Sequence, residues 1–409
     1  MRKTKRTKPT KRALKRLGLA EFAALMAFLI SITALSIDII LPVKTEIGLE
    51  MGITNENTTQ LVITSLFLGL AIGQLIYGPV SDTIGRKPAM AYGFGVFIAG
   101  TLLCLFAHSF HALLIGRFLQ GLGSAAPRII SMSMIRDLYD GREMAKVTSI
   151  IMGFFILVPA IAPALGQFIV NFAPWRAIFA VLLTQAILVG SWLLFRQPET
   201  LHPEYRRAFN LAQLRKNTAE VLSTKVSFWY TIAAGLIFGA FISYIVTSEQ
   251  LFKDLFGIDE AFPYYFGALA IMIGCASIFN ASLVEKFGMR KLCQFSLVIQ
   301  ISLSAIFFVI ALCQGGQLSL AMFMVWALSA FFMMGFLFGN FNAIALSPLG
   351  HIAGIGAAIV GSISTFLSMG IGAIIGLLYN QSVLPMIGGF AVLGVLSLTI
   401  MKLVDRNEA

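Results

Sequence analysis

Three ionisable side chains, Asp38, Arg117 and Arg128, interrupt long apolar stretches of this 409-residue sequence. If those stretches cross a membrane, each such group costs about 2.5 to 3.5 kcal/mol on insertion scales. Residues of this kind pair with one another or line a pathway for protons or substrates. The function therefore depends on which elements hold these three residues.

The composition indicates that the apolar stretches do lie in lipid. Apolar residues make up 58% of the chain and charged residues only 12%, which excludes an ordinary soluble protein. At about 20 residues per crossing, the sequence predicts twelve membrane-spanning helices. They are expected at residues 20–42, 60–80, 89–107, 112–134, 147–170, 175–195, 226–248, 262–283, 292–313, 318–340, 354–379 and 383–402.

Basic residues predict the orientation of these helices. Residues 2–16 hold nine Lys and Arg and no acid, and we interpret this run as an arm that contacts anionic headgroups rather than nucleic acid. Lys and Arg also gather in the loops after even-numbered spans, so both termini are expected in the cytoplasm. The expected units are a basic cytoplasmic tail (1–18), a six-helix bundle (19–195), a cytoplasmic central loop (196–225), a second six-helix bundle (226–404) and a cytoplasmic C-terminus (405–409). The predicted fold class is an all-α polytopic membrane protein with two pseudo-symmetric halves.

Asp38 and Arg117 are predicted to lie at similar depths. At about 1.5 Å per residue, they lie roughly 6 and 8 Å below the outer ends of their spans, so they could share one polar pocket. A nearby arginine favours the charged carboxylate and loss of water favours the protonated acid, and these opposed effects can tune a proton site. The alternative is a static Asp38–Arg117 pair that only holds the two helices together.

Polar residues form a stripe along the fourth predicted span. Arg117, Gln120, Ser124, Arg128 and Ser131 recur at intervals of three or four residues, so they share one helix face. That face is expected to contact water or protein rather than lipid. For Arg128, a second ion-pair or anion contact and an extension toward the cytoplasmic interface both remain open.

The fifth predicted span contains Pro159, Pro163 and Gly166. Two prolines four residues apart each remove a backbone hydrogen bond on one face of the helix, which favours a bend. The bend is either a static kink or part of the outer gate of a moving bundle.

A charged turn follows the second predicted span, from Gly78 to Lys87. Gly85 allows a tight reversal, and Asp82 and Arg86 can pair with charges on neighbouring helix ends such as Arg136 and Asp137. A related turn, Val284 to Lys291, occurs about half a chain later. The turn is interpreted as a cytoplasmic gating contact, with a plain basic membrane anchor as the alternative.

Other functional classes lack the residues they would need. The four histidines are predicted at loops or helix ends, and no Gly-rich phosphate loop occurs, so we expect no metal site, no cofactor and no direct use of ATP. A membrane enzyme would need a cluster of nucleophile, base or metal ligands inside a span, and a sensor would need a soluble module. A gradient-driven transporter is the prediction that remains.

Four motifs of the sequence resemble those of a known protein family. Ser36 to Pro42, Gly78 to Lys87, Gly116 to Gly121 and Arg136 to Tyr139 are similar to motifs of the major facilitator superfamily, and within it to the twelve-span drug:proton antiporters of the bicyclomycin-resistance (Bcr/CflA) branch. The fifth span departs from the family pattern, with Ala162 where a glycine usually precedes the proline and Gln167 where a second glycine is common.

The resemblance implies particular roles. Asp38 would be the proton and substrate carboxylate, Arg117 its coupling partner, and Asp82, Gly85 and Arg86 parts of the gate. The implied function is efflux of small, largely apolar drugs in exchange for protons at the bacterial inner membrane. An importer, or an exporter of one metabolite, is the alternative. The expected partners are a small-molecule substrate, protons and membrane lipids, without nucleic acid, and the chain is expected to act as a monomer.

Overall fold

The protein is almost entirely helical. The computed structural model describes residues 17–206 and 210–406, so the basic tail at residues 2–16 lies outside the described residues. Within these ranges twelve helices have 20 or more residues, one at each expected position. They are α1 (Leu19–Asp38), α3 (Leu61–Ile84), α4 (Arg86–Leu105), α5 (Phe110–Leu138), α6 (Gly141–Val170), α7 (Arg176–Arg196), α9 (Lys225–Phe256), α10 (Phe262–Phe287), α11 (Met289–Cys313), α12 (Leu320–Leu346), α13 (Ala353–Leu377) and α14 (Leu384–Arg406).

Short elements connect the long helices. They are η2 (Leu41–Val43), α2 (Lys44–Glu50), η3 (Glu56–Gln60), η4 (Pro203–Tyr205), α8 (Leu211–Ser223) and η5 (Ser347–Ile352). The stretch 196–225, expected as a loop, thus contains the 13-residue helix α8, which packs on α9 and α13. Asn210 caps α8 by accepting a hydrogen bond from the backbone N–H of Gln213 at 3.0 Å, as expected at a helix start.

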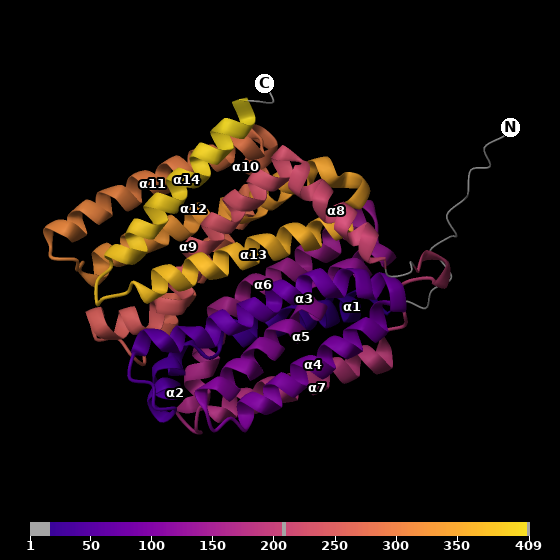
Figure 1. The fold of residues 1–409 in the computed structure, drawn as a ribbon, viewed down its shortest axis with the longest axis horizontal. Coiled ribbons are helices and arrows are strands. Elements are labelled where there is room, and N and C mark those ends of the chain that lie inside the picture. The colour runs from indigo at the N-terminus through magenta and orange to yellow at the C-terminus, as the bar shows by residue number, and fades with distance from the viewer. Residues whose placement is uncertain (1–16, 207–209, 407–409) are drawn as a thin grey trace.

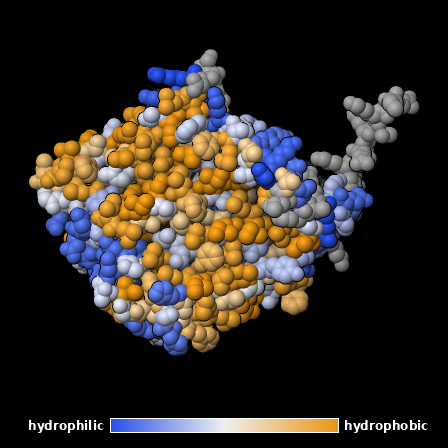
Figure 2. Space-filling model, in the orientation of Figure 1, coloured by the Kyte–Doolittle hydropathy of each residue, from blue (hydrophilic) through white to orange (hydrophobic). Residues whose placement is uncertain are grey.

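The chain is a multi-pass membrane protein. Among the described residues, ten helical segments are long and apolar enough to cross a bilayer, and one of them, Leu320–Leu377, contains both α12 and α13. Helix α5 is not among the ten, because polar residues such as Arg117, Gln120 and Arg128 lower its mean hydropathy. In Figure 2 apolar residues cover the middle of the visible face, whereas hydrophilic residues gather toward the ends of the helices.

The long helices form two groups that lie side by side (Figure 1). The first group is α1 and α3–α7, and the second is α9–α14. Contacts between the groups run mainly through α3 with α13 and α6 with α10. We call the two ends of the molecule the α2 end and the α8 end, after the short helices found there (Figure 1).

Two helices end elsewhere than expected, for local reasons. The expected first span reached residue 42, but α1 ends at Asp38, because Pro42 has no N–H to donate to the Asp38 carbonyl. The expected seventh span ended at residue 248, but α9 continues to Phe256 and stops at Gly257, which has a φ of +65°. This left-handed conformation favours glycine and closes the helix.

Helices α3 and α5 pack so closely that glycine is required between them. A Cβ atom on Gly121 would lie 1.9 Å from the backbone oxygen of Leu66, and one on Gly69 would lie 2.0 Å from that of Phe118. Backbone atoms cannot move aside as a side chain can. Small residues of this kind allow membrane helices to approach one another.

We expect Gly121→Ala to destabilise the protein by about 1 to 3 kcal/mol, the usual cost of overpacking. The measurement is the thermal unfolding midpoint of the purified protein in detergent. Gly95→Ala on α4 is the matched control, because nothing lies within 4 Å of the Cβ it adds. Equal midpoints for the two variants would contradict the proposed packing constraint.

Candidate functional site

A cavity of about 330 Å³ lies between the two helix groups. Residues of α1, α3, α5 and α6 line one side, and residues of α9, α10, α12 and α13 line the other. A volume of this size is at the lower end of the range for small-molecule sites. Its position between two helix groups is also where transporters bind their substrates.

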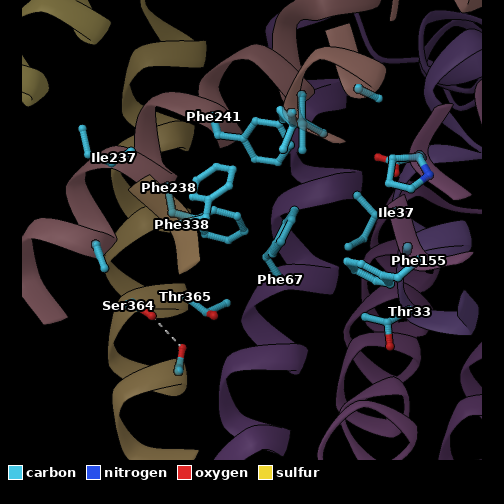
Figure 3. A pocket seen from close by; sticks show the side chains of 18 of the residues that line it. Thr33, Ile37, Phe67, Phe155, Ile237, Phe238, Phe241, Phe338, Ser364 and Thr365 are labelled. Carbon is cyan, nitrogen blue, oxygen red and sulfur yellow. Dashed lines mark hydrogen bonds between the residues drawn. The ribbon is translucent and has the colours of Figure 1, made fainter. Parts of the chain in front are cut away.

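Aromatic rings form much of the cavity wall. The lining aromatic residues are Phe67, Phe155, Phe238, Phe241, Tyr244, Phe266, Phe331, Phe338 and Phe341. In Figure 3, Phe67 from the first group faces Phe238 and Phe338 from the second, while Ile37 and Phe155 lie on the far side of Phe67. The Phe67 and Phe238 ring centroids are 6.4 Å apart, a contact that crosses between the groups. Such a wall suits apolar and aromatic ligands.

Asp38 and Arg128 are the only charged residues that the structure places on the cavity wall within the described ranges. Asp38 is 4% exposed, and neither residue makes a hydrogen bond or ion pair with another described residue. Across the cavity, the Tyr244 hydroxyl is buried and has no hydrogen-bond partner among the described residues. Asp38 and Arg128 therefore line the cavity without a protein partner among the described residues, and a bound molecule could pair with them.

Arg117 does not share this pocket with Asp38, contrary to the expectation from depth. Its side chain is fully buried between α1, α3 and α5, and it donates to the backbone oxygens of Ser36 at 2.9 Å and Val62 at 3.1 Å. It also donates to Gln120 Oε1 at 3.0 Å. The expected depths were similar, but Asp38 faces the cavity between the helix groups, whereas Arg117 lies inside its own helix group, against α1 and α3.

The rest of the α5 stripe serves the same packing. Gln120 donates through Nε2 to Thr101 Oγ1 at 2.9 Å, and the Ser124 backbone oxygen accepts from Thr33 Oγ1 at 2.9 Å. Both residues are fully buried and neither lines the cavity. Of the two interpretations of Arg128, the structure favours a contact in the cavity over an extension toward the interface.

A charged cluster joins α3, α4, α5 and the segment after α7 at the α8 end. The Arg86 guanidinium donates to Asp137 Oδ2 at 2.9 Å and forms an ion pair with Asp82. Glu199 accepts from the backbone N–H groups of Arg86 at 2.9 Å and Lys87 at 3.0 Å. The start of α4 is thus held by an acid that the sequence reasoning missed, although Glu199 is an isolated acid just beyond the sixth apolar run.

The other predicted residues of this turn have separate roles. Gly85 has a φ of +108°, and a side chain there would collide with Glu199. Arg136 donates to Met132 O and Ser133 Oγ on its own helix, not to Asp82. Gly78 faces Ala358 of the second helix group.

Helix α6 continues through both prolines. Pro159 lines the cavity. Gly166 faces α1, where an added Cβ would lie 2.0 Å from the backbone oxygen of Ile39. The three residues predicted as a kink therefore include one cavity-lining residue and one position of close helix contact.

A buried ion pair closes the α2 end. Lys44 and Glu249 lie just beyond the expected spans 20–42 and 226–248, where the sequence predicts loops, but the structure places them in α2 and α9, with exposures of 0% and 4%. Lys44 Nζ is 3.7 Å from Glu249 Oε2 and donates to the Val246 backbone oxygen at 2.5 Å. Thr45 also donates to Glu249 at 2.9 Å. The second helix group therefore does contain a buried acid, because α9 is two turns longer than the sequence indicated.

Further hydrogen bonds join the two groups at the same end. Asn57 Nδ2 donates to Tyr379 O at 2.9 Å, Gln60 Nε2 donates to Gly376 O at 3.1 Å, and Gln250 Nε2 donates to Asn57 Oδ1 at 3.2 Å. Farther along, Ser362 Oγ donates to Ala71 O at 2.6 Å. Between described residues, no hydrogen bond or ion pair joins the groups at the α8 end. The structure is therefore closed toward the α2 end.

The family model described as Major Facilitator Superfamily matches residues 23–373. This chain belongs to the major facilitator superfamily. It is accordingly a membrane transporter, whose family in general is not enzymatic.

Relatives support the branch indicated by the motifs. The transporter is 28% identical over 383 residues to a bicyclomycin resistance protein homolog of Haemophilus influenzae, a match that covers 92% of this chain and 94% of the relative. It is 27% identical over 329 residues to the multidrug resistance protein MdtL of Klebsiella pneumoniae, covering 80% of each. These matches confirm the resemblance to the bicyclomycin-resistance branch.

A solved structure confirms the fold. The transporter aligns with the human organic anion transporter MFSD10 (TETRAN) with a TM-score of 0.72 and 15% identity, covering 95% of this chain and all of the other. At this identity, the likeness concerns the arrangement of helices alone.

Proposed function

We propose that this transporter exports small, largely apolar compounds in exchange for protons. The proposal rests chiefly on Asp38, an almost fully buried acid without a partner among the described residues, on the wall of an aromatic cavity between two helix groups. An acid in that position can bind or release a proton at the place where a substrate binds. The drug-resistance names of the relatives support the substrate class.

We also propose the membrane arrangement. The twelve long helices cross the bacterial inner membrane, as a bundle over 19–195 and a bundle over 226–404, and both termini and α8 lie in the cytoplasm. The gathering of Lys and Arg near the α8 end supports this orientation. The α2 end is then the outer end, and the closed contacts there correspond to an inward-facing state.

The transport cycle follows from these positions. Substrate enters from the cytoplasm and binds while Asp38 is ionised. When the outer contacts open, a proton from outside neutralises Asp38 and competes with the bound substrate, which leaves. Arg117 holds α1 against α3 and α5 through Ser36 and Val62, so it keeps the Asp38 helix in position. The Arg86 cluster with Asp82 and Asp137 then serves the inner gate.

Inside-out membrane vesicles test the direction of coupling. An exporter that exchanges substrate for protons is expected to accumulate radiolabelled chloramphenicol in vesicles with an acidic lumen, and to stop when nigericin removes the pH gradient. A proton symporter would show the opposite dependence, since an acidic lumen would drive the compound out. Vesicles without the transporter provide the background.

A drug-susceptibility panel tests the breadth of transport. An efflux-deficient host that expresses the chain is expected to tolerate several structurally unrelated apolar compounds better than the same host with an empty vector. Unchanged susceptibility to every compound would instead favour an exporter of one dedicated metabolite.

A further inference from the structure

The two charged groups of the cavity lie at opposite ends of it. Thr33 Oγ1 donates to the Ser124 backbone oxygen at 2.9 Å, which fixes the relative level of α1 and α5. Asp38 lies five residues beyond Thr33 toward the α2 end, and Arg128 lies four residues beyond Ser124 toward the α8 end, because the two helices run in opposite directions. At 1.5 Å per residue, their backbones are about 13 Å apart along the helix axes.

The cavity wall is mostly apolar, and its uncharged polar residues other than Tyr244 are Thr33, Gln74, Asn342, Ser364 and Thr365. Ile37 and Phe67 lie on this wall together with the rings of Phe238 and Phe338 (Figure 3). Tyr244 also lines this space, and its buried hydroxyl oxygen has no hydrogen-bond partner among the described residues. A buried charge or hydroxyl without a partner is costly, so each end of the cavity is set to receive a complementary group from a ligand.

We propose that the cavity selects elongated neutral or zwitterionic aromatic compounds over simple organic cations. In such a ligand an amine or other hydrogen-bond donor pairs with Asp38, a carbonyl or carboxylate pairs with Arg128, and an aromatic body stacks on the phenylalanine wall. This inference deepens the proposed export function and rests on it for the direction of movement.

The charge balance of the cavity gives the reason. With Asp38 ionised, Asp38 and Arg128 sum to zero; a zwitterion keeps that sum, whereas a cation leaves an uncompensated positive charge in a medium of low dielectric constant. The guanidinium stays protonated, so protonation of Asp38 makes the cavity positive. Protonation of Asp38 releases the donor end of a zwitterion. The positive cavity would instead bind a simple anion more tightly, and the anion would then move in the same direction as the proton. Exchange against protons is therefore compatible with a donor-bearing ligand and not with a simple anion.

The test uses two dyes that differ in one group. Rhodamine 110 carries a free carboxylate and is a zwitterion, and rhodamine 123 is its methyl ester and a cation. We expect the purified full-length protein to bind rhodamine 110 at least about tenfold more tightly, measured by fluorescence polarisation in lipid nanodiscs. Arg128→Met should abolish this preference, and Arg128→Lys, which keeps the positive charge, should retain part of it.

Controls make either result decisive. Arg142→Met, an exposed arginine outside the cavity, should bind both dyes as the unmodified protein does. Equal affinity of the unmodified protein for the two dyes, or an unchanged preference in folded Arg128→Met, would overturn the inference. If Arg128→Met fails to fold, judged by its thermal unfolding midpoint, the comparison of the two dyes on the unmodified protein and on Arg128→Lys still decides.

The binding test needs no ion gradient, so it separates this inference from the proposed function. Dye selectivity that depends on Arg128, without proton-driven transport in vesicles, would leave the charge selection standing and remove the exchange mechanism. Proton-driven transport without dye selectivity would leave the exchange mechanism standing and remove the charge selection.

Discussion

Asp38→Asn is expected to reduce proton-driven efflux to the level of cells without the transporter, while the protein remains folded and inserted. The amide has nearly the same shape as the carboxyl group but cannot bind and release a proton at neutral pH. Asp38 makes no hydrogen bond or ion pair with a described residue, so the substitution breaks no internal contact. The substitution should therefore remove the coupling of efflux to protons and leave the stability of the protein unchanged.

The measurement is chloramphenicol efflux from an efflux-deficient host, together with the thermal unfolding midpoint of the purified variant. Asp259→Asn is the matched control, because this acid is exposed and lies outside the cavity; it should transport normally. Normal drug resistance in cells that carry Asp38→Asn would remove Asp38 from the coupling mechanism.

Glu249→Ala is expected to open the α2 end. Removal of one partner from a buried ion pair leaves the other charge uncompensated, at a cost of about 3 to 5 kcal/mol. Here the partner is Lys44, which is fully buried. Because the pair joins the two helix groups, the cost falls on the closed state, and about 3 kcal/mol corresponds to roughly a hundredfold shift toward the open state.

The shift can be measured with a cysteine at Ile245, which lines the cavity, in a background without the four native cysteines. Glu249→Ala should raise the rate at which a membrane-impermeant thiol reagent labels this cysteine from outside the cell. The matched control replaces both charges, as Lys44→Met with Glu249→Leu, because an apolar pair in place of a buried ion pair is often neutral or stabilising. Slow labelling of Glu249→Ala would show that the ion pair does not hold this end closed. Rapid labelling of the double variant would show that opening does not depend on the uncompensated Lys44 charge.

The sequence alone determined the helical class and the position of each long helix. This follows from the bilayer, which supplies no hydrogen-bond partners, so each apolar run of about 20 residues must satisfy its own backbone as a helix. The tight turn between α3 and α4 was also predictable from the sequence, because glycine at position 85 can adopt the left-handed conformation found there. The three ionisable residues Asp38, Arg117 and Arg128 could likewise be identified from the sequence, because each has a high free-energy cost of insertion into a membrane.

Only the tertiary structure decided which of these residues meet. Depth in the membrane is a single coordinate, and it suggested one pocket for Asp38 and Arg117. In the structure, Arg117 packs against α1 and α3 inside its own helix group, whereas Asp38 and Arg128 line the cavity. Lys44 and Glu249 were counted as loop charges, because partners that are far apart in the chain and in opposite helix groups leave no signal in local sequence. Periodicity and composition describe each helix separately, whereas a cavity and a closing contact depend on how two helix groups pack against each other.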